Sequence, residues 1–320
     1  MISVKKLTKT FQSPVKTGNV LRDFFARKYE MHTAVNNISF DIAEGELIGF
    51  VGPNGAGKTT TLKMLSGILH PTSGEVDIFG FHPFEKNKDF LRQIAFVMGQ
   101  KNQMLWDLPP IDTYILNREI YEIDNKVFKK RLGELVELLD CKKLIDQPVK
   151  TLSLGQRMRV ELIASLLHQP KVLFLDEPTI GLDIFAQTII TRFIKEYQEQ
   201  YHSTILLTSH YMKDIQRLAS RVILIDAGKL IYDGQLSRLV TEYSSHKYVR
   251  VILKKPIDEL WLKKTGLRHS YEFPQLTITL HKDGLEKELQ LLLRHVDFHD
   301  LSLEDEPVEE IIKKVFQKKH

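Results

Sequence analysis

Short apolar runs and helical patterns alternate along the first three quarters of the chain. Two continuous apolar runs, Lys171–Leu175 and Thr204–Thr208, are too short for buried helices and are typical of central parallel strands. Further strand patterns occur at Leu47–Val51, Ile94–Met98 and Val222–Asp226. Helical spacing of apolar residues marks Thr59–Leu69, Asp112–Ile123, Lys126–Leu139 and Gly155–His168. The alternation predicts an α/β fold with a mainly parallel central sheet and an inserted helical subdomain at about residues 101–168.

Weaker strand patterns lie nearer the start of the chain, at Ile2–Phe11, Ser39–Ile42 and Glu75–Phe79. Between the first two, the insertion at residues 12–32 interrupts the strand pattern. Within it, apolar residues recur at helical spacing, at Leu21, Phe24, Phe25 and Tyr29, and the basic residues Arg22, Arg27 and Lys28 lie between them. This stripe would pack onto the same domain, or it would lie against a membrane partner or the lipid surface.

The pattern changes after about Leu239. Strand-like segments at Val249–Leu253, Thr277–Leu280 and His299–Leu303 alternate with helical segments at Ile257–Lys264, Leu285–Leu293 and Pro307–Lys319. We therefore expect a first domain at residues 1–239 and a small α+β domain at residues 240–320.

Composition sets broad limits on the function. The 320 residues have a formal net charge of only +4, which gives little support to nucleic-acid binding. No apolar run approaches the roughly 20 residues needed to cross a bilayer, and the N-terminal segment lacks the apolar core of a signal peptide. Cys141 is the single cysteine, so the chain cannot form an internal disulfide. We expect a cytoplasmic protein.

The segment between the strand at Leu47–Val51 and the helix at Thr59–Leu69 matches the pattern G-x-x-x-x-G-K-[ST]. Its glycines let backbone N–H groups wrap around a triphosphate. The Lys58 ammonium would reach the β- and γ-phosphates, and the Thr59 hydroxyl would coordinate Mg²⁺. Glycine-rich turns are common, but the Lys-Thr pair in this context predicts a phosphate site at Gly52, Pro53, Asn54, Gly55, Ala56, Gly57, Lys58, Thr59 and Thr60.

Two carboxylates follow the apolar strand at Lys171–Leu175. Adjacent acidic residues at a strand end are often only solvated. Beside a P-loop, however, Asp176 would bind Mg²⁺ directly or through water, and Glu177 would polarise the attacking water. The two motifs together predict a P-loop NTPase.

The segment Leu152-Ser153-Leu154-Gly155-Gln156, just before a helix, decides which kind of NTPase this is. Here the chain resembles the ABC ATPase family, whose signature is LSGGQ, with Leu154 in place of the first glycine. Ser153 and the amides that open the following helix would form a second anion site. The resemblance implies that Ser153, Gly155 and Gln156 complete the ATP site of a partner protomer.

Four single residues fall where this family places smaller motifs. The resemblance implies that Gln100 contacts the metal and the attacking water, and that Asp183 communicates across the dimer. It also implies that His210 contacts the γ-phosphate. Phe11 would stack on adenine, unless it is a core phenylalanine. Each of these residue types is usually a solvated, capping or packing residue when it occurs alone.

The resemblance spans about Ile2 to Leu239 and implies an N-terminal antiparallel β subdomain, ATP and Mg²⁺ as ligands, and ATP hydrolysis. It also implies a second ATPase protomer, a separate transmembrane subunit and a place on the cytoplasmic face of the membrane. The segments around Gln100 and LSLGQRMR resemble the ATPases of ABC-2 type exporters. In this family, the coupling helix of the transmembrane subunit docks at the segment that corresponds to Lys101–Tyr121. Here Trp106, Leu108 and Pro109-Pro110 would form the apolar groove for that helix, or Trp106 would simply fill the local core.

Two other classes of protein remain as alternatives. ABC proteins that act on the ribosome resemble two tandem cassettes, and those that repair DNA carry long coiled coils. This chain has one cassette and no sustained heptads. A module that uses ATP only as a switch is disfavoured by Glu177. Lys58, Ser153, Glu177 and His210 are all present, so a homodimer would have two competent sites, and a heterodimer is also compatible.

Overall fold

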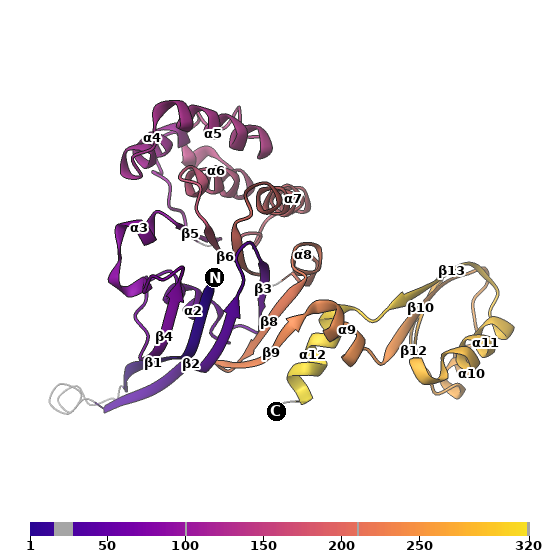
Figure 1. Ribbon diagram of the computed structural model, residues 1–320. Coiled ribbons are helices and arrows are strands. Elements are labelled where there is room, and N and C mark those ends of the chain that lie inside the picture. The colour runs from indigo at the N-terminus through magenta and orange to yellow at the C-terminus, as the bar shows by residue number, and fades with distance from the viewer. Residues whose placement is uncertain (16–27, 100, 210, 319–320) are drawn as a thin grey trace. The chain divides into compact units, whose positions relative to one another are not determined.

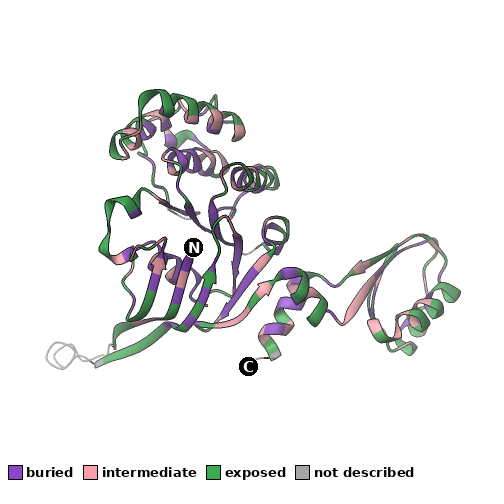
Figure 2. Cartoon of the chain, in the orientation of Figure 1, coloured by how far each residue is buried: buried purple, intermediate pink, exposed green. Residues whose placement is uncertain are grey.

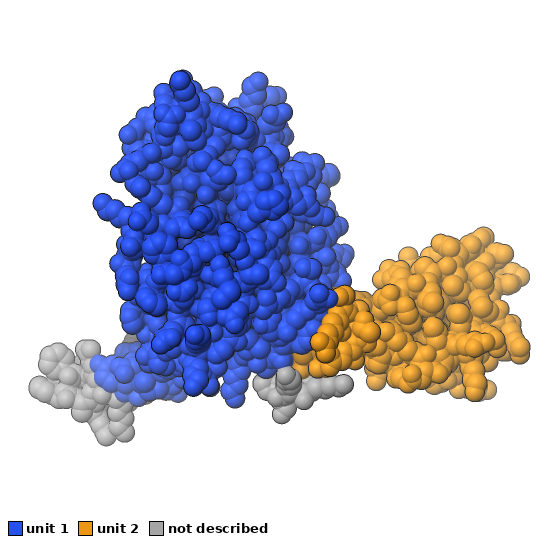
Figure 3. Space-filling view, viewed as in Figure 1, with its two compact units in different colours: residues 1–236 blue, residues 237–320 orange. Residues whose placement is uncertain are grey.

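The computed structural model describes residues 1–15, 28–99, 101–209 and 211–318. The chain divides into two compact units, Met1–Leu236 and Ser237–His320 (Figure 3). No helix within the described residues is long and apolar enough to span a membrane.

A six-stranded sheet forms the centre of the first unit, with the order β5-β6-β7-β3-β8-β9 (Figure 1). Five strands run parallel: β5 (Ile94–Met98), β6 (Val172–Asp176), β7 (Thr204–Thr208), β3 (Leu47–Val51) and β8 (Arg221–Asp226). The edge strand β9 (Lys229–Gln235) pairs antiparallel with β8. Every residue of β3, β6 and β7 is buried (Figure 2), because helices and a second, antiparallel sheet pack against these strands. The predicted mainly parallel sheet is confirmed.

The first unit also contains a three-stranded antiparallel sheet, with the strand order β2-β1-β4. Its strands are β1 (Ile2–Val15), β2 (Lys28–Ile42) and β4 (Ser73–Ile78). One face of this sheet is apolar, and the side chains of Ile2, Val4 and Ile78 join the buried core of the unit. The antiparallel β subdomain implied by the family resemblance is therefore present.

The first hairpin is longer than the sequence pattern predicted. The ladder between β1 and β2 continues through the pairs Gln12↔Met31 and Pro14↔Tyr29. The prediction of a helical stripe reaching Tyr29 is wrong, because backbone pairing holds this exposed residue in a strand. The rest of the predicted stripe, from Leu21 to Arg27, lies outside the described residues.

Helices cover the large sheet and form an insert between β5 and β6 (Figure 1). The insert comprises α4 (Pro110–Ile120), α5 (Asn125–Leu138) and α6 (Leu154–Leu166). The buried Tyr114 hydroxyl donates to the Val160 carbonyl over 3.0 Å and ties α4 to α6. The other elements of the unit are α2 (Lys58–Leu65), α3 (Lys88–Leu91), α7 (Ile184–Tyr201), α8 (Met212–Leu218) and the 3₁₀ turns η1 (Pro83–Glu85) and η2 (Val149–Thr151).

The second unit contains a βαββαβ arrangement. Its antiparallel sheet has the order β11-β12-β10-β13, which is the strand order of a ferredoxin-like fold. Val251 and Ile278 of the sheet pack with Leu262 and Leu292 of the two helices. The elements in chain order are α9 (Leu236–Tyr243), β10 (His246–Leu253), α10 (Glu259–Lys264), β11 (Arg268–Glu272), β12 (Gln275–His281), η3 (Lys282–Gly284), α11 (Leu285–His295), β13 (Phe298–Asp305) and α12 (Val308–Lys318).

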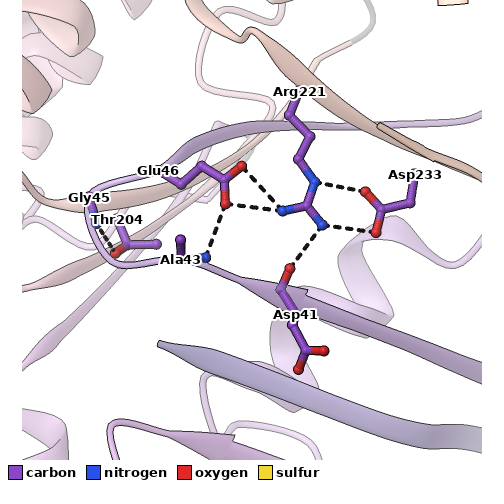
Figure 4. Close-up of polar contacts among 7 residues, drawn as sticks. All are labelled: Asp41, Ala43, Gly45, Glu46, Thr204, Arg221 and Asp233. Carbon is purple, nitrogen blue, oxygen red and sulfur yellow. Dashed lines mark hydrogen bonds and ion pairs between the residues drawn. The ribbon is translucent and has the colours of Figure 1, made fainter. Parts of the chain in front are cut away.

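Arg221 joins three parts of the first unit at the start of β8 (Figure 4). Its guanidinium forms two hydrogen bonds with the Asp233 carboxylate, at 2.8 and 2.9 Å, and two with the Glu46 carboxylate, at 3.1 and 3.2 Å. Nη2, which forms one of the two bonds to Asp233, also donates to the Asp41 backbone oxygen over 2.9 Å. The guanidinium side chain is 23% exposed, so water screens these bonds only in part. Arg221 therefore fixes the edge strand β9 and the end of β2 to the parallel sheet.

We predict that Arg221→Met lowers the free energy of unfolding of this unit by about 1–3 kcal/mol, because two carboxylates then face each other without a cation. Hydrogen exchange of amides in β8 and β9 across a urea series measures the effect. Arg192→Met is the matched control, since the Arg192 side chain is 62% exposed and lies 3.9 Å from Glu196. Equal destabilisation by the two variants would contradict the prediction.

Candidate nucleotide-binding site

The P-loop lies between β3 and α2, as its sequence predicted. Gly57 caps α2 with a left-handed backbone (φ 104°), and a Cβ atom there would lie 2.4 Å from the Ala34 backbone oxygen. Only glycine satisfies both the backbone conformation and this close approach. Asn54 and Gly55 are exposed at the tip of the loop, whereas Lys58 at its end is only 5% exposed.

The Lys58 ammonium turns back into the loop. Its Nζ donates to the Gly52 carbonyl over 2.7 Å and to the Pro53 carbonyl over 3.0 Å. Burial lowers the pKa of Lys58, and the nearby charges of Glu177 and Asp176 oppose that shift. A buried cation held by two neutral carbonyls is suited to exchange them for phosphate oxygens, so a triphosphate fits this cradle.

Asp176 ends β6 beside the P-loop and is 8% exposed. The Thr59 hydroxyl donates to its carboxylate, at 2.8 Å from Oδ2 and 3.0 Å from Oδ1. The Thr208 hydroxyl at the end of β7 donates to Oδ1 over 2.8 Å. Hydroxyl and carboxylate oxygens are ligands that Mg²⁺ accepts together with phosphates and water, so Thr59 and Asp176 fit the ion.

Glu177 follows with a left-handed backbone, at φ 56°. Its backbone N–H donates to the Thr208 carbonyl over 3.1 Å and to the Thr208 hydroxyl over 3.0 Å. This conformation is strained for a residue with a side chain and is held by the two bonds to β7. From the sequence, Thr208 was predicted only as the last residue of a buried strand. Its position at the end of a buried strand, level with Asp176, is the signal that it also organises the two carboxylates.

The signature segment forms the start of α6. The Ser153 hydroxyl accepts from the Gln156 backbone N–H over 3.3 Å, and the Gln156 side chain accepts from the Ser153 N–H over 2.8 Å. This capping box fixes the first turn of α6. A Cβ atom on Gly155 would lie 2.7 Å from Cβ of Ala186 in α7, so a glycine permits the two helix starts to meet. Leu154 is 41% exposed, which explains why a large side chain replaces glycine there.

Asp183 caps α7 next to the signature segment, with its Oδ1 accepting from the Ala186 N–H over 2.8 Å. Thus Ser153, Gly155 and Asp183 gather on one surface. Within the described residues, no hydrogen bond joins this surface to the P-loop of the same chain.

Three other predicted site residues have different outcomes. Phe11 lies in β1 opposite His32 and is 38% exposed, with the Lys9 ammonium 5.2 Å from its ring centre. Its side chain is therefore accessible and is not a core phenylalanine. Gln100 and His210 lie outside the described residues.

Comparison with known proteins agrees with this geometry. The family model for ABC transporters matches residues 35–180. The chain is 30% identical over 264 residues to the bacitracin transport ATP-binding protein BcrA of Bacillus licheniformis, covering 81% of both chains. It is 29% identical to the ABC transporter ATP-binding protein NatA of Bacillus subtilis, covering 72% of this chain and 94% of NatA. It is also 32% identical to the Nod factor export ATP-binding protein I of Cupriavidus metallidurans, in an alignment that covers 66% of this chain and 69% of that protein.

Solved structures share the fold. A dimeric ATP-binding cassette in a post-hydrolysis state with ADP and phosphate matches with a TM-score of 0.62, at 24% identity, over 73% of this chain and 98% of the other. The ATP-binding subunit of an ABC transporter matches with a TM-score of 0.63 at 21% identity. The match covers 83% of this chain and 99% of that subunit. With a bacterial relative at 30% identity covered over four fifths of its length, this chain belongs to the ABC transporter family, as an ATP-binding and ATP-hydrolysing subunit.

Proposed function

We propose that this subunit powers export by an ABC-2 type transmembrane permease, from the cytoplasmic face of the membrane. Cassettes of this family dimerise and pair with transmembrane subunits. The direction is supported by relatives whose names describe bacitracin transport, linearmycin resistance and Nod factor export. The division of the chain after Leu236 supports a cassette at residues 1–239 and an accessory domain at residues 240–320.

The arrangement of Lys58, Asp176 and Glu177 at the P-loop supports the ATP-driven part of the proposal. Bound Mg²⁺ would offset the charge that develops on the phosphates. The Lys58 ammonium would exchange its carbonyl partners for β- and γ-phosphate oxygens, while the backbone N–H groups of residues 52–60, except Pro53, hold the phosphates. Thr59 and Asp176 would hold the ion, together with Gln100. Glu177 would polarise the attacking water, and His210 would contact the γ-phosphate.

The signature surface of one chain would complete the nucleotide site of a second chain, and a homodimer has two such sites. Ser153, Gly155 and Gln156 open α6, whose amides present partial positive charge to an anion. Asp183 lies on the same surface and would report the state of one site to the other. Phe11 would stack on the adenine from its exposed position on β1.

The loop before α4 is the proposed link to the permease. Trp106 and Leu108 are 46% and 44% exposed. The Arg157 guanidinium lies 5.0 Å from the Trp106 ring centre, and the Lys150 backbone N–H donates to the Trp106 carbonyl over 3.0 Å. A movement of this loop would therefore reach the residues that flank Ser153.

The role of Glu177 is tested by Glu177→Gln. We expect this isosteric variant to bind ATP normally but to hydrolyse it roughly 10²–10⁴-fold more slowly, because the amide does not accept the proton of the attacking water. ATP should then trap a closed dimer, measured by light scattering after size exclusion. Glu199→Gln, at an exposed position of α7, is the control and should turn over normally. Near-normal turnover by Glu177→Gln would refute the role.

The role of Thr208 is tested by Thr208→Val, which keeps the side-chain volume but removes the hydroxyl. We expect kcat for ATP hydrolysis to fall about tenfold, because the carboxylate of Asp176 and the backbone of Glu177 each lose a hydrogen bond. Thr204→Val is the control. Thr204 lies at the other end of β7, and this variant removes only the hydrogen bond that the Gly45 N–H donates to the Thr204 hydroxyl. If the two variants reduced kcat equally, Thr208 would be a structural residue only.

A further inference from the structure

A pocket of about 560 Å³ lies between the helical insert and the large sheet. We call it the insert pocket. Its lining includes Ile68, Leu91 and Ile120, which are 58%, 40% and 60% exposed and come from the turn after α2, from α3 and from α4. Side chains of β5 and α6 also line it. Exposed apolar residues around a concave site are typical of a surface that another protein covers.

Glu161 lines the insert pocket from the middle of α6 and is only 4% exposed. Burial raises the pKa of its carboxyl group, and the nearby backbone amide of Gln103 opposes that shift only in part. Its Oε1 has no hydrogen-bond partner among the residues that the structure describes, and no described lysine or arginine forms an ion pair with it. A carboxyl group buried in this way is costly unless something pairs with it.

The remaining lining of the insert pocket offers no compensating charge. Burial lowers the pKa of His168 to about 4, so its imidazole is neutral at pH 7. Its Nε2 lies 3.0 Å from the Ile94 carbonyl and donates to it, which leaves Nδ1 as a second buried acceptor without a described partner. Burial also raises the pKa of Tyr121, which stays neutral. Lys101 and Arg157 line an adjoining pocket that shares Glu161.

We propose that the insert pocket receives one basic side chain, presented by an apolar helix of the transmembrane subunit, and that Glu161 recognises it. The inference rests on the proposed function and adds the chemistry of the docking element. Charge complementarity supports it, because the lining supplies a buried carboxyl and a second acceptor within an apolar rim. A guanidinium has five donors and is suited to such a site. The contact would act on the helix that begins at Ser153.

The proposal is tested with helix-stapled fluorescent peptides of about 14 residues, or four helical turns. One peptide carries a central arginine among leucines, and its partner carries norleucine at that position. We expect the full-length protein to bind the arginine peptide about 10–100-fold more tightly, the range of a charged hydrogen bond in a desolvated site. Glu161→Gln should abolish this preference. Glu122→Gln, whose side chain is 73% exposed and paired with Arg92, should retain it.

A second measurement needs no variant. Burial raises the pKa of Glu161 to about 8, so the free carboxyl is mostly protonated at pH 7. A docked cation would favour the carboxylate, and binding should release about one proton with the arginine peptide but none with the norleucine peptide. Calorimetry in two buffers with different ionisation enthalpies measures this number.

Three results would overturn the proposal: equal binding of the two peptides, an arginine preference that survives in Glu161→Gln, or no binding of either peptide. ATP hydrolysis measured on the same preparations separates this failure from a failure of the proposed function. An active ATPase without the arginine preference would refute the recognition by Glu161 and leave the cassette assignment intact.

Discussion

The parallel pairing of β3, β6 and β7 is the constraint on which the site depends. Because the three strands run in one direction and are buried on both faces, their carboxyl ends meet at one edge of the sheet. That edge brings the P-loop after β3, the carboxylates after β6 and Thr208 at the end of β7 into hydrogen-bond contact. The apolar residues of these strands carry no chemistry, but they fix the positions of the polar residues at and just after the strand ends.

Local sequence patterns predicted the parts of the fold in which burial dominates. The bounds of β3, β5 and β7 agree with the sequence prediction, because a continuous apolar run between polar residues is readable without tertiary information. β9 was missed, since Asp233 and Gly234 are poor strand formers and backbone pairing with β8 holds this edge strand. The length of the β1–β2 hairpin was underestimated for the same reason, because cross-strand pairing holds its exposed end in the strand conformation.

Among the site residues, too, those with a local sequence signal were predictable and those that depend on tertiary packing were not. Lys58, Thr59 and Asp176 were predictable because their spacing and strand context are local, and the structure brings them together. The burial of Glu161 was not predictable, because a glutamate within a helical pattern is usually solvated and only tertiary packing around α6 buries it. The helix α6 then connects two surfaces, since Ser153 caps its start and Glu161 faces the insert pocket.

The central claim is that each ATP site combines the P-loop of one chain with the signature segment of another. The most direct test uses dimers isolated with two affinity tags, in which one chain carries Lys58→Ala and the other carries Ser153→Arg. Both lesions then fall in one site, so the other site is intact and should hydrolyse ATP in a single turnover. A dimer of one wild-type chain and one chain with both lesions should be inactive, because each site has one lesion. The reverse pattern, with the first dimer inactive and the second half-active, would contradict the account.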